Sequence, residues 1–408
     1  MGSSAIAVTG LGLVSPLGIG LAENWAGLCA GTSRATPDDV LADLTVNFSY
    51  PVPGFAEAEL VSRQLAWRLD PYAQMALVAA REAVADAGLD PQDWNGARVA
   101  VVLGTGGPSS AAWDRTMEHI AAGRNDRVSA LFLPRTLPNL AAGEISTDLQ
   151  ALGPSLSVST ACASGTTAIG LGRDLLRSGA CDLAVVGGAE SGRNRACCIG
   201  FHRMGALSTR RDNPAAASRP FDAERDGFVL GEGAGILVLE READAVARRA
   251  RIRGRVAGFG SSADAHHFTA PHPEGRGAEL AINAAVADAG LAPSDISHVN
   301  AHGTSTPVGD AVEAAVLHRL FPHRPPITAT KSLTGHTLGA SGALEAAFTL
   351  LSLEHQLVPP IANLDRADET AAELDLVVDR ARPVTGAAAI SPSFGFGGQN
   401  AAVVLTVP

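Results

Sequence analysis

The sequence predicts an α/β protein made of two related halves that pack around a shared layer of helices. Strand-like apolar runs alternate with helical patterns along the chain, which is typical of sheets covered by helices on both faces. The tripeptide Ala-Ser-Gly opens an alanine-rich helical pattern twice, at 163–165 and at 340–342. Both patterns are later followed by strands with glycines at a bend, at 228–235 and 394–400. This repetition predicts an internal duplication.

Length and composition describe a chain that can bury a large core. The chain has 408 residues, of which 46% are hydrophobic and 18% are charged. Its formal net charge of −11 argues against nucleic acid as a partner. Its five cysteines lack C-x-x-C spacing, so neither a disulfide framework nor a metal site is expected. Because no apolar run reaches membrane-spanning length and the N-terminus lacks a signal-peptide pattern, we expect a cytoplasmic protein without a membrane partner.

The first half is expected to be a series of strands and helices separated by turns. Between 60 and 87 apolar residues recur at helical spacing, and Gly88 supplies a C-cap. The glycines at 104–107 follow a strand, but no Walker lysine follows them, so they are interpreted as a turn rather than a phosphate site. The segment 219–240 is interpreted as a glycine-kinked hairpin. The expected strands are 5–14, 98–103, 156–160, 182–189 and 235–239, and further helices are expected at 24–30 and 244–253.

The arginine-rich segment 244–253 is the expected boundary between the two halves, 1–250 and 251–408. The second half repeats the alternation of strands and helices. Its expected strands are 255–260, 296–300, 327–330, 387–392 and 401–407, and its expected helices are 278–289, 311–320 and 340–353.

Cys162 carries the main chemical signal of the first half. The segment 156–160 alternates apolar with small polar residues, which predicts a buried strand. Only small residues surround Cys162, and a helix follows with apolar residues at Ala168, Leu171 and Leu175. Cys162 is therefore expected at a helix N-terminus, where unpaired N–H groups and the helix dipole favour the nucleophilic thiolate. The alternative is a small buried hydrophobic residue, as free cysteines often are.

The second half places catalytic residue types at glycine-flanked turns. His302 follows a strand, and Lys331 and His336 lie between a strand and a helix. A histidine at such a place is often merely packed or solvated. Lys331 is the single lysine among 31 basic residues, which indicates a site where a planar guanidinium does not serve. Together with Cys162, these residues favour a catalytic site.

In this order the motifs resemble the β-ketoacyl synthase family, specifically the Cys–His–His condensing enzymes of fatty-acid and type II polyketide synthesis. The resemblance covers essentially the whole chain. It is carried by VSTACASGTTAIG (158–170), RPFDAERDGFVLGEGAG (219–235), NAHGTSTPVGD (300–310), KSLTGHTLGASG (331–342) and GFGGQN (395–400). The resemblance implies a thiolase-like, duplicated αβαβα five-layer sandwich that forms dimers. It also implies that no cofactor is needed, because substrates arrive on the phosphopantetheine arm of an acyl carrier protein.

The resemblance also implies the role of each site residue. Cys162 would take up the acyl chain, with the backbone N–H groups of Cys162 and Phe396 holding the oxyanion. Neutral His302 and His336 would stabilise the enolate formed when a malonyl thioester loses CO2. Lys331 would support the site electrostatically with Glu345 as its ion partner, and Phe396 would gate the acyl pocket.

Further residues are assigned by the same resemblance. Supporting positions around the gate are Phe394, Gly395 and Gly397, and positions expected to contact the carrier arm or substrate are Thr269, Thr304 and Thr306. Arginines expected to dock the carrier protein are Arg63, Arg68, Arg124, Arg127, Arg210 and Arg211, although each could equally be a solvated surface residue.

The sequence departs from the housekeeping fatty-acid enzymes at two places. The loop 62–70 is less basic than in those enzymes, and Gln399 stands where many relatives have threonine. These departures favour a ketosynthase subunit of a type II polyketide system, with polyene products among the options, over a fatty-acid elongating enzyme. The partner would be a second copy or a chain-length-factor-like subunit.

Three other classes of protein share the expected fold. A non-catalytic chain-length factor is disfavoured because such subunits usually lose the cysteine, and Cys162 is present. A degradative thiolase would need a second cysteine near the C-terminus, but no cysteine follows Cys198. A Cys–His–Asn starter enzyme is disfavoured because a histidine occupies the asparagine position.

Overall fold

The computed structural model describes residues 5–56, 59–107 and 110–408. Within these ranges the main element is an eleven-stranded mixed sheet, in which two sets of five strands repeat one order and the short strand β2 (Gly18–Ile19) pairs with β1. The first set is β6 (Ser155–Val158), β5 (Val99–Gly104), β7 (Leu183–Ser191), β8 (Glu232–Arg241) and β1 (Ile6–Ser15). The second set is β11 (Ile327–Thr328), β10 (Ile296–Asn300), β14 (Ala388–Gly395), β15 (Gln399–Thr406) and β9 (Gly254–Ala263). In each set the third strand along the chain lies at the outer edge and the first lies at the centre, which confirms the predicted duplication.

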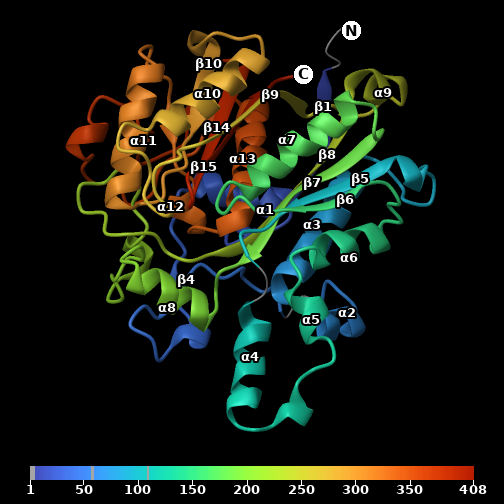
Figure 1. Cartoon of the computed structure of the whole chain (residues 1–408). Helices are drawn as coiled ribbons and strands as arrows, with labels where there is room; N and C mark the ends of the chain where they lie inside the picture. The colour runs from blue at the N-terminus through green and yellow to red at the C-terminus, as the bar shows by residue number, and fades with distance from the viewer. Residues whose placement is uncertain (1–4, 57–58, 108–109) are drawn as a thin grey trace.

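Helices separate and cover the two sets of strands. The helices α7 (Ser164–Arg177) and α13 (Ser341–His355) pack against each other and against strands of both sets. The outer face of the first set is covered by α3 (Pro71–Asp86) and α6 (Leu140–Asp148), and that of the second by α10 (Arg276–Asp288) and α11 (Pro307–Leu320). Figure 1 shows α10 and α11 on the opposite side of the molecule from α3 and α6, with α7 and α13 between them. The predicted αβαβα sandwich is confirmed.

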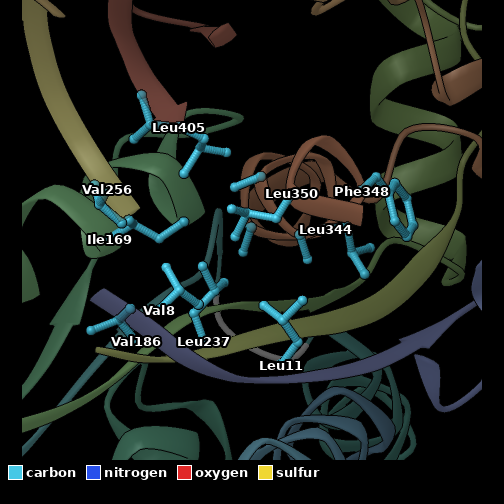
Figure 2. Packing of buried hydrophobic residues seen from close by; sticks show 14 of the residues in the cluster. Val8, Leu11, Ile169, Val186, Leu237, Val256, Leu344, Phe348, Leu350 and Leu405 are labelled. Atoms are coloured by element: carbon cyan, nitrogen blue, oxygen red, sulfur yellow. The ribbon is translucent and has the colours of Figure 1, made fainter. Parts of the chain in front are cut away.

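The central core lies where the two sets of strands meet. Antiparallel pairing of β1 with β9 joins them at Ala7↔Arg255 and Val8↔Gly254. Leu344 and Phe348 of α13 are buried in one cluster with strand residues such as Val8 and Leu237, as Figure 2 shows. Apolar burial therefore holds α13 in place, which fixes the N-terminal end of this helix beside the predicted site residues.

The remaining elements lie around this framework. The further helices are α1 (Leu21–Ala30), α2 (Arg63–Arg68), α4 (Ser110–Ala121), α5 (Phe132–Thr136), α8 (Arg195–Arg203), α9 (Glu242–Ala247) and α12 (Lys331–Thr334). The short strands are β2 (Gly18–Ile19), β3 (Thr36–Pro37), β4 (Phe48–Ser49), β12 (Leu357–Val358) and β13 (Arg382–Pro383). Across the described part of the chain, no helix is both long and apolar enough to cross a bilayer.

Two predicted elements of the first half were wrong. The single helix expected at 60–87 is broken into α2 and α3, because Pro71 starts a new helix at its N1 position. The hairpin expected at 219–240 does not form. The only regular strand there is β8, and it pairs with β7 across a long insertion that contains α8. The strands that correspond to the β14–β15 hairpin are β7 and β8. They are neighbours in the sheet, but a long insertion separates them in the sequence.

The strand and helix around Cys162 also differ from the prediction. The strand β6 is an edge strand rather than a buried one, and Leu156 is 42% exposed in the single chain. In α7 the predicted apolar face is rotated, because Leu171 is exposed while Ile169 and Leu176 are buried. Arg173 is buried there as well, with its guanidinium donating to backbone carbonyls of β9.

Candidate active site

The predicted catalytic residues meet at the carboxyl ends of parallel strands. In the first half β6 runs parallel to β5 and leads to Cys162. In the second half β10 runs parallel to β11 and β14 and leads to His302, while Lys331 follows β11. Ligands in α/β proteins bind at this edge of a sheet. The duplication brings the two edges together, so Cys162, His302 and His336 line one cavity of about 380 Å³.

Cys162 lies in a sharp turn directly before α7. Ala161 adopts φ +49°, in the left-handed region, and α7 begins two residues after Cys162, at Ser164. The backbone of Gly395 passes so close that a Cβ there would lie 2.6 Å from the Thr160 carbonyl oxygen. This approach allows the backbone N–H of Phe396 to donate a hydrogen bond to Cys162. The sulfur is therefore held between the two halves of the protein.

Burial opposes the thiolate form that the place of Cys162 beside a helix N-terminus favours. Burial raises the pKa of the Cys162 thiol to about 11, and the charge of Lys331 and the hydrogen bond from Phe396 oppose this only in part. Desolvation disfavours the charged form of a buried thiol, so it acts against the helix N-terminus at this position.

His336 presents a defined nitrogen to this sulfur. Its Nε2 lies 3.0 Å from Cys162 Sγ. On the other side of the ring, the backbone N–H of Leu338 donates to Nδ1 at 3.3 Å. Because Nδ1 accepts this bond, the proton of the neutral ring is on Nε2. Burial and the charge of Lys331 hold the pKa of His336 well below its usual range, so the ring is a neutral donor.

His302 is held by the backbone as well as by its ring. The carboxylate of Glu313 on α11 accepts the backbone N–H groups of His302 and Gly303, both at 2.7 Å. The ring centres of His302 and His336 lie 5.6 Å apart with the planes nearly perpendicular. Burial, followed by the charges of Lys331 and His336, holds the pKa of His302 well below its usual range. Two neutral imidazole rings therefore line the same cavity.

Lys331 is buried, and its single ammonium group contacts three acceptors. Its Nζ donates to the carboxylate of Glu345, to the His302 carbonyl oxygen at 2.5 Å and to His302 Nδ1 at 3.2 Å. The ion pair with Glu345 is the one expected from the sequence. Burial raises the pKa of Glu345 to about 7, against the lowering effect of Lys331. The lysine thus fixes the His302 ring with its Nδ1 as acceptor.

The cavity walls include most of the other predicted positions. Thr269, Thr304 and Thr306 line the cavity, as do Phe394, Gly395 and Phe396. The backbone N–H of Gly397 donates to the carbonyl of Phe268 at 3.0 Å, which links the gate loop to the segment before Thr269. Whether these residues contact a carrier arm stays a prediction.

Sequence reasoning missed an aromatic cluster beside the sulfur. Phe228 meets His336 edge to face at 5.1 Å, and Phe201 contacts both Phe228 at 5.3 Å and Phe396 at 6.0 Å between ring centres. Phe201 and Phe228 also line the cavity. Phe228 stands inside the glycine-rich motif 219–235, so its aromatic character next to a glycine was the available signal. The cluster gives the cavity an apolar wall.

The two buried carboxylates Glu313 and Glu190 were also missed. Each accepts backbone N–H groups of a glycine-rich loop. For Glu313 the signal was its place on the helix that follows the His302 loop, whose exposed N–H groups need an acceptor. No comparable local signal marks Glu190.

The predicted docking arginines have different environments. Arg63, Arg124, Arg127 and Arg211 are exposed, whereas Arg68 is bound to Glu144 and Arg210 lies near Glu224 and Asp226. Their role in carrier docking stays a prediction. In the described ranges, no group of three His, Cys, Asp or Glu side chains is arranged to hold a metal ion.

Comparisons with known proteins cover the whole chain. A family model described as "Beta-ketoacyl synthase, N-terminal domain" matches residues 3–245, and one described as "Beta-ketoacyl synthase, C-terminal domain" matches residues 253–365. The curated "3-oxoacyl-[acyl-carrier-protein] synthase 2" of Vibrio cholerae is 39% identical over 411 residues, which span 99% of this chain and 99% of that protein.

Solved structures resemble the chain over its full length. The structure described as "The ishigamide ketosynthase/chain length factor" has a TM-score of 0.93 and 34% identity, and covers 100% of both chains. A type II polyketide ketosynthase solved in complex with its acyl carrier protein and bound to a hexaketide has a TM-score of 0.91 and 30% identity, also over 100% of both chains. A third, "Ketosynthase (ApeO) in Complex with its Chain Length Factor (ApeC) from Xenorhabdus doucetiae", has a TM-score of 0.82 and 28% identity, and covers 99% of this chain and 98% of that one.

Proposed function

Because the chain belongs to the β-ketoacyl synthase family, we propose that it condenses an acyl thioester with malonyl-acyl carrier protein, releasing CO2. The product is a β-ketoacyl chain two carbons longer on the carrier. The observation that carries the proposal is the 3.0 Å approach of His336 Nε2 to Cys162 Sγ, with the His302 ring in the same cavity. A nucleophile and two neutral hydrogen-bond donors in one cavity suit acyl transfer followed by enolate chemistry.

In the first step the sulfur of Cys162 attacks the carbonyl carbon of the acyl thioester. The bond between that carbon and the pantetheine sulfur breaks, and the thiol proton of Cys162 passes to the departing sulfur. The N–H groups of Cys162 and Phe396 hold the oxyanion in between. The Lys331 charge, which lowers the pKa of Cys162, favours the sulfur anion during the attack.

In the second step the malonyl group loses CO2 and its electron pair forms an enolate. His302 and His336 donate hydrogen bonds to the enolate oxygen. Both rings are neutral at neutral pH because both pKa values lie well below 6.5, and each donates through its single N–H. The enolate carbon then attacks the acyl carbon on Cys162, the carbon–carbon bond forms, and the carbon–sulfur bond breaks. The sulfur leaves as a thiolate and takes a proton from water, which restores the thiol. No cofactor or metal takes part in these steps.

Replacement of single residues tests these roles. We expect Cys162→Ala to form no acyl-enzyme with a radiolabelled acyl carrier. His302→Ala and His336→Ala should lower condensation by about 10²-fold or more, as removal of an oxyanion donor does, while acylation changes far less. An acyl-enzyme in Cys162→Ala, or equal losses in both half-reactions for the histidine variants, would contradict the assignment.

For the metabolic role, we favour a ketosynthase subunit of a type II polyketide system. The similarity to polyketide ketosynthases solved with a carrier protein or a chain length factor supports this role, as does the weakly basic loop 62–70. The second candidate is a fatty-acid elongating enzyme, which is favoured by 39% identity to a curated 3-oxoacyl-[acyl-carrier-protein] synthase 2. A non-catalytic chain-length partner is disfavoured, because Cys162, His302, Lys331 and His336 are all in place.

The proposed partners are an acyl carrier protein and a second ketosynthase-like subunit. The edge strand β6 with its exposed Leu156 offers backbone groups for pairing with such a subunit. Incubation of the purified protein, alone and with candidate partners, with malonyl-carrier and acyl-carriers of several lengths tests both points. Intact mass spectrometry of the carrier then reports which chains grow and which partner is required.

A further inference from the structure

Glu190 is a buried carboxyl group beside the active site that the steps above do not use. It lies near the end of β7 and is 7% exposed. Burial raises the pKa of Glu190 to about 7. A carboxyl group in such a place requires several hydrogen bonds to be tolerated, and these bonds show what it holds.

The partners of Glu190 belong to two loops that are distant in the sequence. In the loop after β5, the Thr105 hydroxyl donates to Oε2 at 3.0 Å and the Gly107 N–H at 3.3 Å, and the Gly106 N–H donates to the same oxygen. In the turn before α13, the Gly339 nitrogen lies beside the same carboxylate, because a Cβ on Gly106 would meet Glu190 Oε2 at 3.1 Å and the Gly339 nitrogen at 3.4 Å, and the Gly339 N–H lowers the pKa of Glu190. Glu190 therefore joins these loops through their backbones.

The two loops pack against each other without any side chain between them. A Cβ on Gly339 would lie 2.2 Å from the Gly106 nitrogen, so the backbones are in direct contact. The first loop is also tied to the cysteine turn, because the Ser164 hydroxyl donates to the Thr105 carbonyl at 3.3 Å. The contact thus couples the turn of Cys162 with the turn that follows His336.

Gly339 lies within the short segment that orients the His336 ring. Leu338, its neighbour, donates its N–H to His336 Nδ1, and the Ser341 hydroxyl lies 3.0 Å from the same nitrogen. We propose that Glu190 is a positioning residue, which fastens this segment to the loop after β5 and so holds His336 Nε2 on Cys162. Glu313 accepts the N–H groups of the His302 loop directly, whereas Glu190 accepts those of the loop that packs against the His336 turn.

The catalytic part of this inference rests on the proposed function, whereas its structural part does not. Glu190→Gln keeps the size of the side chain but replaces one acceptor oxygen with a donor. The matched control is Glu240→Gln, a buried strand glutamate that is bound instead by Thr9 and Arg248. We expect Glu190→Gln to fold, because its volume is unchanged.

Hydrogen–deuterium exchange of the full chain tests the coupling of the two loops. In Glu190→Gln, we expect peptides covering 102–107 and 336–343 to exchange faster together, with the rest of the chain unchanged. Glu240→Gln should leave both peptides at the wild-type rate. Faster exchange in one of the two loops alone, or throughout the chain, would overturn the inference. Because this measurement needs no substrate, it stands even if the condensing activity proves to be different.

Kinetics with pre-acylated enzyme then test whether Glu190 acts through His336. Glu190→Gln should lower the condensation rate by about 10- to 100-fold, the usual cost of a displaced catalytic group, with the KM for malonyl-carrier within about twofold. In the His336→Ala background the same substitution should have no further effect. An equal loss in both backgrounds would show a role independent of His336 and overturn the assignment. Should no variant or wild type condense, the proposed function fails instead.

Discussion

Substitution of Lys331 by arginine tests the physical reason for the single lysine of the chain. The Lys331 side chain is 1% exposed, and its Nζ contacts the Glu345 carboxylate and both the carbonyl oxygen and Nδ1 of His302. Arginine keeps the positive charge and therefore the attraction to Glu345. Its planar guanidinium is larger, however, and cannot present one nitrogen to all of these acceptors.

The cost of Lys331→Arg follows from this packing. Extra atoms in a close-packed site cost about 1–3 kcal/mol of stability. The His302 ring must move to make room, and a displacement of about 1 Å costs roughly 10²-fold in rate. We therefore expect a folded protein with a lower denaturation midpoint, a condensation rate reduced by about 10²-fold and a smaller change in acylation of Cys162.

Single-turnover condensation of pre-acylated enzyme with malonyl-carrier measures this effect. Glu345→Gln is the matched variant, because it removes the charge of the partner while leaving the lysine and the size of the site unchanged. If Lys331→Arg condenses within about twofold of the wild type, shape is not the reason for the lysine. If Glu345→Gln loses condensation while Lys331→Arg keeps it, charge pairing rather than geometry accounts for the lysine.

Two further predictions concern backbone space and pH. Gly395→Ala would place a Cβ 2.6 Å from the Thr160 carbonyl oxygen, so the Phe396 N–H should move off Cys162 and acylation should fall by about 10²-fold; acylation at the wild-type rate would contradict the oxyanion role of this loop. The free energy of unfolding should fall as pH rises from about 7 to 8, because burial raises the pKa of Glu313 to about 8 and of Glu190 and Glu345 to about 7, so the native state binds more protons than the unfolded chain in this window. Over that range His302, His336 and His298, whose pKa values are lowered, are mostly neutral in the native state and in the unfolded chain; urea midpoints that rise with pH would refute the assignment, and Glu313→Gln should flatten the dependence.

Much of the architecture could be predicted because its signals are local. Strand and helix periodicity placed β10 at the bounds that the structure has, and the Ala-Ser-Gly repeats located α7 and α13. The wrong predictions concern residues whose burial is decided by segments distant in the sequence. The apolar alternation of β6 predicts a buried strand, yet the strand lies at the edge of the sheet and Leu156 is exposed in the single chain.

The candidate site divides in the same way. Cys162, His302, Lys331 and His336 could be found because each stands beside small or glycine residues that a reacting group needs around it. The raised pKa of Cys162 could not be predicted, because its largest cause is burial in the folded protein. Glu190 was invisible for the same reason, since its partners lie about 85 residues before it and about 150 after it.

The sequence by itself determined the reacting groups, the duplicated α/β order and the turns that carry the chemistry, because residue type and hydrophobic period act over a few neighbouring positions. Only the tertiary structure decided which nitrogen of His336 faces the sulfur, that burial raises the pKa of the Cys162 thiol, and which buried carboxylates hold the two histidine segments. These properties depend on dielectric surroundings and hydrogen-bond partners, and folding assembles both from segments that are far apart along the chain.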